Sequence, residues 1–268
     1  MKGTLYFVAT PIGNLKDITY RAVETLNMVD AILCEDTRHS AILLNSLNIS
    51  KPLYAFHKFN YAKVIPTYIE MLNSGKNLAL ISDAGMPAIS DPGAEIISAL
   101  IEHNIPYTII PGASAGLSAL VLSGQNTQSF CFLGFLPEKK QEEFLAPYVN
   151  LPATLIFYSA VHDVHRDIEV LFKYLGNRKL TVVREITKKF EQVVHTTLQA
   201  GYTGELKGEF VFIVEGNKVQ NSALTSLSIE DHYNFYLRLG NDKKTAMKLV
   251  AKDRGIAKNE IYKILIKE

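Results

Sequence analysis

Two Ser-Asp pairs follow one apolar run, residues 78–81, and each pair is soon followed by glycine. The first reads SDAG (residues 82–85) and the second SDPG (residues 90–93). Carboxylates accept hydrogen bonds or face a cation, and glycine lets the backbone come close to a ligand. The pattern predicts a loop shaped around a small molecule, with Asp83 facing it. Because Pro92 suits the first turn of a helix, Asp91 is predicted to cap the helix that follows.

Other apolar runs also end in polar or glycine-containing stretches. They are VATPIGNLKDIT (residues 8–19), ILCEDTRHS (32–40), IIPGASAG (109–116) and, in the second half, FVFIVEG (210–216). Each stretch alone is typical of ordinary turns. Several at the carboxyl ends of strands in one sheet would line one crevice. The EDTRHS stretch brings together an acid, an arginine and a histidine, which suit proton transfer or charge stabilisation.

Two common classes of cofactor site are disfavoured. The first apolar run is not followed by G-x-G-x-x-G, and the sequence contains no G-x-x-x-x-G-K-[ST], so a phosphate-bearing cofactor is not expected. The only cysteines are Cys34 and Cys131, and no His/Cys cluster has metal-ligand spacing. We therefore expect no metal site.

The elements that would position these residues alternate between strands and helices over the first 115 residues. Such alternation predicts a mostly parallel sheet covered on both faces. Pro66 falls within the third predicted helix, which should therefore be shorter or kinked. The predicted strands are Thr4–Ala9, Ala31–Cys34, Pro52–Phe56, Leu78–Ser82 and Tyr107–Ile110, and the predicted helices are Thr19–Met28, Ser40–Leu47, Ala62–Leu72 and Pro92–Glu102.

A second α/β unit follows the polar stretch 122–130, which is predicted to connect the two domains. Its period-two pattern at 193–198 indicates a half-exposed antiparallel strand. The predicted domains are 1–122, 123–228 and a helical tail at 229–268. The further strands are predicted at Cys131–Gly134, Thr154–Tyr158, Leu180–Arg184, Val193–Leu198 and Phe210–Glu215.

The composition describes a globular protein with an uneven charge distribution. Of the 268 residues, 47% are hydrophobic and the net charge is +1. Residues 238–268 hold nine Lys/Arg against four Asp/Glu, so a basic tail follows a slightly acidic body. Such a tail permits contact with nucleic acid. No apolar run is long enough for a membrane span and no signal peptide is recognisable, so a cytoplasmic location is expected.

Six motifs together carry a resemblance to a known family. ATPIGNLKDIT, EDTRHS, LISDAGMPAISDPG, IIPGASA, TLIFYSAVHD and VVREITKKFE occur in the order seen in tetrapyrrole-methylase-like (class III) S-adenosylmethionine methyltransferases. Among these, the chain most resembles the cytidine-2′-O-methyltransferases of small-subunit (16S) ribosomal RNA. The resemblance implies two α/β domains with mixed sheets, a cleft for S-adenosylmethionine between them, a small helical tail and a homodimer acting on the small ribosomal subunit.

A ribose hydroxyl is a weak acid, so a nearby base or cation should help it lose its proton. The candidate catalytic residues are Asp36, His39 and Glu185, with Arg38 and Arg184 holding phosphate or stabilising charge, and their spacing does not choose among them. The residues expected to bind S-adenosylmethionine are Pro11, Ser82, Asp83, Ala84, Gly85, Ile89, Ser114, Ala115, Phe157, Tyr158 and Glu215. The tail is expected to contact rRNA phosphates through Lys243, Lys244, Lys248, Lys252, Arg254 and Lys258.

The sequence departs from the family pattern at four positions. Ser159, Val161 and Asp163 stand where the family commonly has an acid, a proline and an arginine, and Met86 replaces a threonine. Two alternative functions remain open. One is methylation of a small molecule such as a tetrapyrrole, which would not need the basic tail. The other is a non-catalytic RNA-binding protein of the same fold, which would not bind S-adenosylmethionine.

Overall fold

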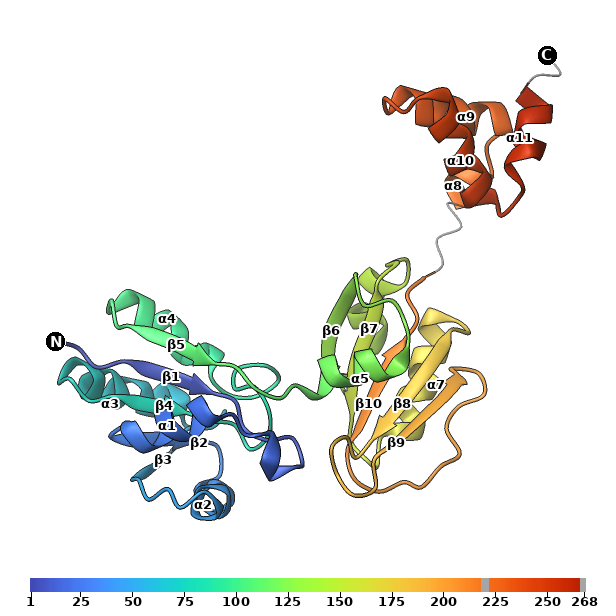
Figure 1. Ribbon diagram of the computed structural model, residues 1–268. Helices are drawn as coiled ribbons and strands as arrows, with labels where there is room; N and C mark the ends of the chain where they lie inside the picture. Colours follow the sequence, from blue (N-terminus) through green and yellow to red (C-terminus); the bar gives the residue numbers. More distant parts are fainter. Residues whose placement is uncertain (218–221, 266–268) are drawn as a thin grey trace.

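The computed structural model describes residues 1–217 and 222–265. Its first sheet contains five parallel strands in the order β3-β2-β4-β1-β5 (Figure 1). All five predicted strands are confirmed. They are β1 (Leu5–Val8), β2 (Ala31–Cys34), β3 (Leu53–Ala55), β4 (Leu78–Leu80) and β5 (Tyr107–Ile110).

Helices cover both faces of this sheet because its strands are apolar on both sides. The helices are α1 (Tyr20–Met28), α2 (Thr37–Ser46), α3 (Tyr61–Asn73) and α4 (Ala94–Glu102), with a short 3₁₀ turn, η1, at Leu15–Asp17. Leu26 of α1 and Leu44 of α2 share one core cluster, and Leu72 of α3 and Leu100 of α4 share the other. The third helix is not shortened, since α3 extends over 13 residues with Pro66 inside it, and the alternative of a kink at Pro66 stays a prediction.

The second sheet is mixed and has the strand order β6-β7-β10-β8-β9. Its strands are β6 (Phe130–Phe135), β7 (Thr154–Ser159), β8 (Lys179–Arg184), β9 (Gln192–Thr197) and β10 (Phe210–Val214). Only β6 and β7 run parallel, and β10 is antiparallel to both of its neighbours. The predicted antiparallel strand is β9, at one edge. Two sheets of these types confirm the predicted fold class.

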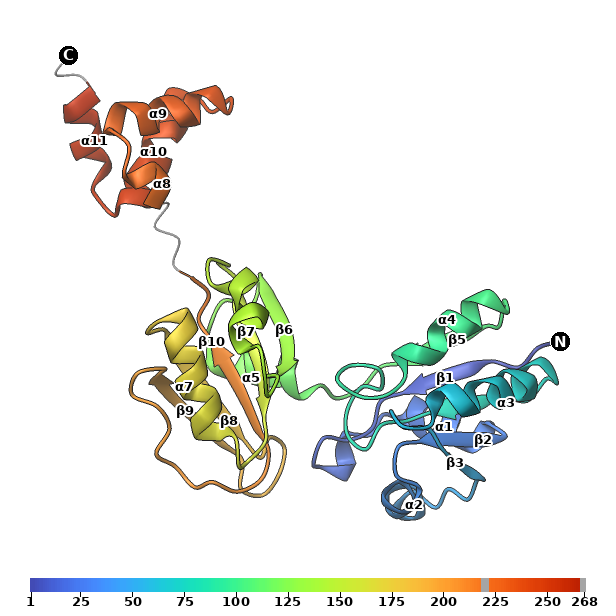
Figure 2. The same cartoon turned by 180° about the vertical axis from the view of Figure 1, so that it is seen from behind.

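Helices also cover both faces of the second sheet. Helix α5 (Ala115–Ser123) packs on one face and α7 (Val164–Leu175) on the other, as the opposite view shows (Figure 2). The short α6 (Gln141–Leu145) and η2 (Ala146–Tyr148) precede β7. Because α5 belongs to the second core, the chain passes between the sheets at residues 111–114, and the stretch 122–130 joins α5 to β6. The domain bounds stay predictions.

Four helices form a cluster of their own after β10. They are α8 (Ser222–Thr225), α9 (Ile229–Arg238), α10 (Lys243–Arg254) and α11 (Lys258–Leu265). Val250, Ala251 and Ile261 form its buried apolar core. Within the described residues, no helix has the length and apolarity needed to cross a bilayer.

A buried polar network ties α9 to α10. His232 is fully buried, and its Nε2 lies 3.1 Å from Asp253 Oδ2. Arg254 Nε donates to His232 Nδ1 at 3.1 Å, so Nδ1 accepts and Nε2 carries the hydrogen given to Asp253. The Tyr236 hydroxyl donates to the same carboxylate oxygen. This network holds Asp253 between two helices.

Candidate functional site

The main candidate site is a cavity of about 490 Å³ where the carboxyl ends of the first sheet meet the second sheet. Parallel α/β sheets bind ligands at this end. The first sheet contributes loops that follow β2, β4 and β5, and the second contributes the end of β7 and the beginning of β10. The lining residues are Ile12, Glu35, Asp83, Ala84, Gly85, Met86, Ile89, Ser90, Asp91, Ser114, Ala115, Phe135, Tyr158, Ser159, Ala160, Val161, His162, Ile186, Gly208, Glu209, Phe210 and Val211.

The loop after β4 is held in place by its backbone. Gly85 and Thr10 exchange two hydrogen bonds, with N···O distances of 2.8 and 3.1 Å. Gly85 has φ +80°, a conformation that glycine adopts readily. The buried Ser82 hydroxyl lies 3.3 Å from the carbonyl oxygens of both Ala84 and Gly85. Ser82 therefore shapes the loop from behind and is not among the residues that line the cavity.

Asp83 lies where three cavities meet. It lines the main cavity, a second of about 310 Å³ with Pro11 and His39, and a third of about 520 Å³ with Asp36 and Arg38. Its Oδ1 atom is buried and has no hydrogen-bond partner among the described residues. A buried carboxylate oxygen without a partner is costly unless a ligand supplies a donor. Asp83 is thus the strongest single indication of a bound ligand.

Asp91 has a different role from the predicted one. Helix α4 begins after Gly93, whose N–H donates to Glu95 Oε2 at 3.0 Å, so the prediction of an Asp91 cap is wrong. Ser90 and Gly93 both have positive φ, and this turn separates Asp91 from the helix. Asp91 lines the cavity instead. Burial, followed by the nearby Glu35 and Asp83 carboxylates, raises the pKa of Asp91 to about 6.

The cavity lining is acidic. It includes Glu35, Asp83, Asp91 and Glu209, and no Lys or Arg is among the described lining residues. Glu209 is neutralised from outside the cavity, since Lys188 Nζ lies 2.9 Å from its Oε2. On the opposite wall, Tyr158 accepts a hydrogen bond from Gly116 N at 3.3 Å, and burial raises its pKa. Such a lining favours a cationic ligand with apolar parts.

The EDTRHS residues lie beside the main cavity. Asp36 caps α2 by accepting hydrogen bonds from the N–H groups of Arg38 and His39, and its carboxylate pairs with the Arg38 guanidinium at 3.2 Å. These hydrogen bonds from Arg38 lower the pKa of Asp36, which makes it a weak base. Arg38 and His39 are exposed. His39 lines the 310 Å³ cavity.

Arg184 and Glu185 are held by other side chains. Arg184 is buried at the end of β8, where Glu205 Oε2 lies 2.9 Å from its guanidinium. Glu185 pairs with Lys188 at 2.8 Å and accepts a hydrogen bond from Glu209 N. Burial would raise the pKa of Glu185, but these two partners together lower it. Neither residue lines the three cavities around Asp83.

The structure places two expected donor-binding residues elsewhere. Phe157 is fully buried in the core against α7, because neighbouring residues of a strand face opposite sides and Tyr158 faces the cavity. Glu215 follows the far end of β10, because β10 runs antiparallel and only its beginning reaches the cavity. The other expected residues at the main cavity are Ala84, Gly85, Ile89, Ser114, Ala115 and Tyr158.

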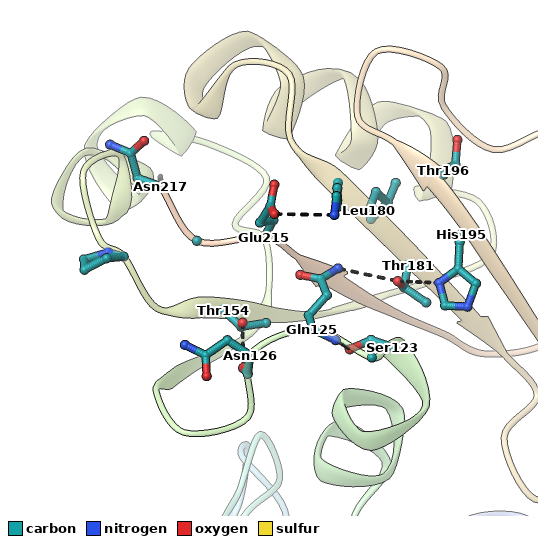
Figure 3. Close-up of a pocket in the computed structure, with 14 residues that line it drawn as sticks. Ser123, Gln125, Asn126, Thr154, Leu180, Thr181, His195, Thr196, Glu215 and Asn217 are labelled. Carbon is teal, nitrogen blue, oxygen red and sulfur yellow. Dashed lines mark hydrogen bonds and ion pairs between the residues drawn. The ribbon is translucent and has the colours of Figure 1, made fainter. Parts of the chain in front are cut away.

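Glu215 lines a separate polar cavity of about 600 Å³ at the opposite end of the second sheet (Figure 3). Thr181 Oγ1 and His195 Nδ1 lie 3.1 Å apart there. Gln125 Nε2 donates to the carbonyl of Ile213 at 2.9 Å. Thr154 and Thr196 donate to the backbone carbonyls of Asn126 and Gly201, so several polar side chains of this cavity serve the structure of the second sheet.

Several lining residues were not predicted. Glu35 lies in the EDTRHS motif and could have been included. Residues 208–211 carry no such signal, because only the antiparallel pairing of β10 brings its beginning to the cavity. Of the four departures, Met86, Ser159 and Val161 line the cavity, while Asp163 pairs with Arg166 at 2.7 Å. The Ser159 hydroxyl donates to Asp167 Oδ2 at 2.7 Å.

Comparison with known proteins decides the family. Residues 4–200 match the model of the Tetrapyrrole (Corrin/Porphyrin) Methylases. The chain belongs to the tetrapyrrole methylase family. This confirms the resemblance drawn from the motifs. Solved structures agree in fold: a uroporphyrin III C-methyltransferase of Thermus thermophilus (TM-score 0.60, 19% identity) covers 80% of this tetrapyrrole methylase and 97% of its own chain. A diphthine synthase (TM-score 0.62, 14% identity) covers 80% and 90%.

Curated relatives place this tetrapyrrole methylase more narrowly. A Halalkalibacterium halodurans protein named ribosomal RNA small subunit methyltransferase I is 44% identical, over 100% of this chain and 96% of its own length. The Bacillus subtilis protein of the same name is 40% identical over 97% and 93%, and that of Escherichia coli O157:H7 is 37% identical over 100% and 96%. These matches include the C-terminal helices, which extend beyond the region matched by the family model.

Proposed function

We propose that this protein transfers the methyl group of S-adenosylmethionine to the ribose 2′-hydroxyl of a cytidine in small-subunit (16S) ribosomal RNA. The observation that carries the proposal is its full-length similarity, at 44% identity, to a protein named ribosomal RNA small subunit methyltransferase I. A ribosomal substrate implies a cytoplasmic location. The small-molecule alternative is not favoured, because these relatives match the basic tail as well as the body.

The main cavity fits S-adenosylmethionine. The bound donor supplies an electrophilic methyl group on a sulfonium cation. Asp83, with its unpartnered Oδ1, and Asp91 provide negative charge for a cation. Ile12, Ile89 and Phe135 provide apolar walls. At Gly85 the backbone itself forms the surface, which allows close approach.

The acceptor side is proposed to work mainly by positioning. Holding a hydroxyl in line with its reaction partner supplies most of the acceleration in a displacement of this kind. We propose that Arg38 and His39, which are exposed beside Asp83, contact the RNA. Asp36 would orient Arg38 through their ion pair. Arg184 and Glu185 would support the site through Glu205 and Lys188.

The function can be tested on ribosomal subunits. Small subunits that lack the modification are incubated with the purified protein and S-adenosylmethionine carrying a labelled methyl group. Digestion of the rRNA to nucleosides should yield label in 2′-O-methylcytidine. Label on a base, or on a tetrapyrrole but not on rRNA, would contradict the assignment, and failure to bind S-adenosylmethionine would indicate a non-catalytic protein.

We also propose that two copies of the chain associate through an apolar surface on β5 and α5. Tyr107 and Ile109 on the edge strand β5 are 42% and 46% exposed. Leu117 and Val121 on α5 are 50% and 73% exposed, although the opposite face of this helix is buried against the second sheet. An exposed apolar edge strand and an exposed apolar helix face are each typical of a surface that another chain covers.

Replacing Leu117 and Val121 together with glutamate is expected to convert the dimer to a monomer, because two charges would be buried at the interface. Light scattering should show the molecular mass fall by half. The control is Ile101→Glu, which changes an isolated apolar residue on α4 that is 60% exposed. A wild-type protein that is monomeric at micromolar concentration would refute the proposed dimer.

The tail is proposed to bind rRNA phosphates through five lysines. Arg254 is excluded from the predicted six, because its guanidinium donates to His232 and to the carbonyls of Leu224, Leu227 and Ser228. On α10, the buried residues Ala246 and Val250 lie on the side opposite Lys244, Lys248 and Lys252. The five lysines are Lys243, Lys244, Lys248, Lys252 and Lys258.

Changing these five lysines to glutamine should weaken rRNA binding and flatten its dependence on salt, since fewer counterions are released. Affinity for S-adenosylmethionine should not change. Filter binding at several salt concentrations measures both the affinity and the slope. An equal number of exposed lysines of the body provides the control: Lys63, Lys76, Lys139, Lys140 and Lys173. An unchanged slope in the tail variant would mean that these lysines do not contact phosphate.

A further inference from the structure

Three carboxylates of the main cavity come from two loops, one after β2 and one between β4 and α4. Glu35 follows β2, Asp83 follows β4, and Asp91 precedes α4. Burial and then the charges of Glu35 and Asp83 raise the pKa of Asp91, so both carboxylates lie close enough to repel that of Asp91. From the second sheet, Tyr158, His162 and Glu209 also line the cavity, and Glu209 is paired with Lys188. We call Glu35, Asp83 and Asp91 the acidic trio.

The acidic trio lacks a cationic partner among the described lining residues. Concentrated negative charge in a half-buried site is unfavourable unless a cation offsets it. The loop that carries Asp83 is held by the backbone hydrogen bonds between Thr10 and Gly85, and these bonds do not offset the negative charge of the trio. A positive charge on the ligand would relieve the repulsion.

The donor and its product differ in the charge that the trio would face. In the proposed reaction the oxygen of the acceptor forms a bond to the methyl carbon, and the carbon–sulfur bond breaks with its electron pair remaining on sulfur. The hydroxyl proton leaves to solvent or to a nearby base. S-adenosylhomocysteine therefore carries one positive charge fewer than S-adenosylmethionine. The two ligands are otherwise almost the same in shape.

We propose that the acidic trio makes the cavity select the charged donor over the uncharged-sulfur product, so that methyl transfer itself weakens binding and promotes product release. This inference rests on the proposed function. It adds Glu35 and Asp91 to the site as residues that set specificity between donor and product.

A proton linkage follows from the trio. The carboxyl of Asp91, with a pKa of about 6, is ionised at pH 7.5 and largely protonated at pH 5. A cationic ligand favours the ionised form and lowers this pKa, so binding near pH 6 releases a fraction of a proton. Donor affinity should fall about fivefold from pH 7.5 to pH 5, if the bound ligand lowers the pKa by about one unit. Affinity for the product should change much less.

Isothermal titration calorimetry of the full chain with S-adenosylmethionine and with S-adenosylhomocysteine tests this inference. Titrations at pH 5, 6 and 7.5, in buffers of different ionisation enthalpy, give the affinity and the number of protons released. Asp91→Asn should abolish most of the proton release at pH 6. It should also reduce the preference for donor over product by roughly tenfold at pH 7.5. Glu35→Gln should also reduce this preference, and it tests the inference if the Asp91 variant does not fold.

The matched control is Glu102→Gln, which removes an exposed carboxylate at the end of α4, outside the cavity. It should leave both affinities and the proton release as in the wild type. Binding of both ligands with an equal pH dependence, or an unchanged preference in the trio variants, would overturn the inference while leaving the proposed function intact. Absence of binding by either ligand would instead refute the proposed function and, with it, this inference.

Discussion

Replacing Gly85 with valine is expected to reduce affinity for S-adenosylmethionine by about 100-fold or more, while the protein stays folded. Gly85 has φ +80°, and a branched residue is a true outlier there. A Cβ at this position would lie 3.2 Å from Ile12 Cγ2 and 3.7 Å from the carbonyl oxygen of Ala113. Strain at Gly85 would shift the loop that carries Asp83. Calorimetry measures the affinity, and circular dichroism checks the fold.

The matched control is Gly201→Val. Gly201 has φ +72°, so the backbone strain is similar, but a Cβ there would meet no atom within 4 Å. Gly201 also lies outside the cavities around Asp83. The control should lose some stability and keep its donor affinity. If Gly85→Val binds the donor as the wild type does, the loop after β4 is not the donor site.

Replacing Asp253 with alanine should unfold the C-terminal helices and leave the donor site unaffected. The side chain of Asp253 is only 14% exposed, and its Oδ2 is shared by His232 and Tyr236. Removing one partner of a buried charged network costs about 3–5 kcal/mol. The apolar core of these helices is small, so this loss should exceed the free energy of unfolding of the helical cluster.

Hydrogen exchange followed by mass spectrometry separates the two parts of the chain. Amides of α9 and α10 should lose protection in Asp253→Ala, while those of β1 and β4 keep theirs. Glu260→Ala, an exposed carboxylate on α11, is the control and should leave protection unchanged. Full protection of α9 in the Asp253 variant would show that the buried network does not hold these helices together.

The sequence was sufficient for the fold and for most of the loops around the cavity. Strands such as β2 and β4 are short apolar runs followed by polar residues, and local pattern alone identifies them. Their parallel order brings Glu35 and Asp83 together, and this too follows from strand–helix alternation. The family motifs then predict that the ligand is S-adenosylmethionine.

The sequence did not predict the direction of β10 or which residues of β7 face the cavity. The family resemblance predicts Glu215 at the donor site, but antiparallel pairing places that end of β10 away from the main cavity. Phe157 and Tyr158 are neighbours in sequence, and only their phase in β7 decides which one faces the cavity. Motif position does not specify that phase.

The sequence also does not predict the geometry of the turn before α4 or the side chains that Arg254 contacts on other helices. Asp91-Pro92 has the pattern of a helix start, yet positive φ values at Ser90 and Gly93 delay the helix and leave Asp91 in the cavity. Arg254 belongs to a basic stretch, and nothing in its spacing indicates that His232, on another helix, holds it. Such roles depend on contacts between elements.

The antiparallel direction of β10 places the C-terminal helices away from the main cavity. One end of the strand borders the main cavity, and the other leads away from it toward the C-terminus. The Thermus thermophilus structure covers 80% of this chain and 97% of its own, and residues 218–268 are about a fifth of this sequence. We therefore expect that the helices after β10 can be exchanged without changing the residues that line the main cavity.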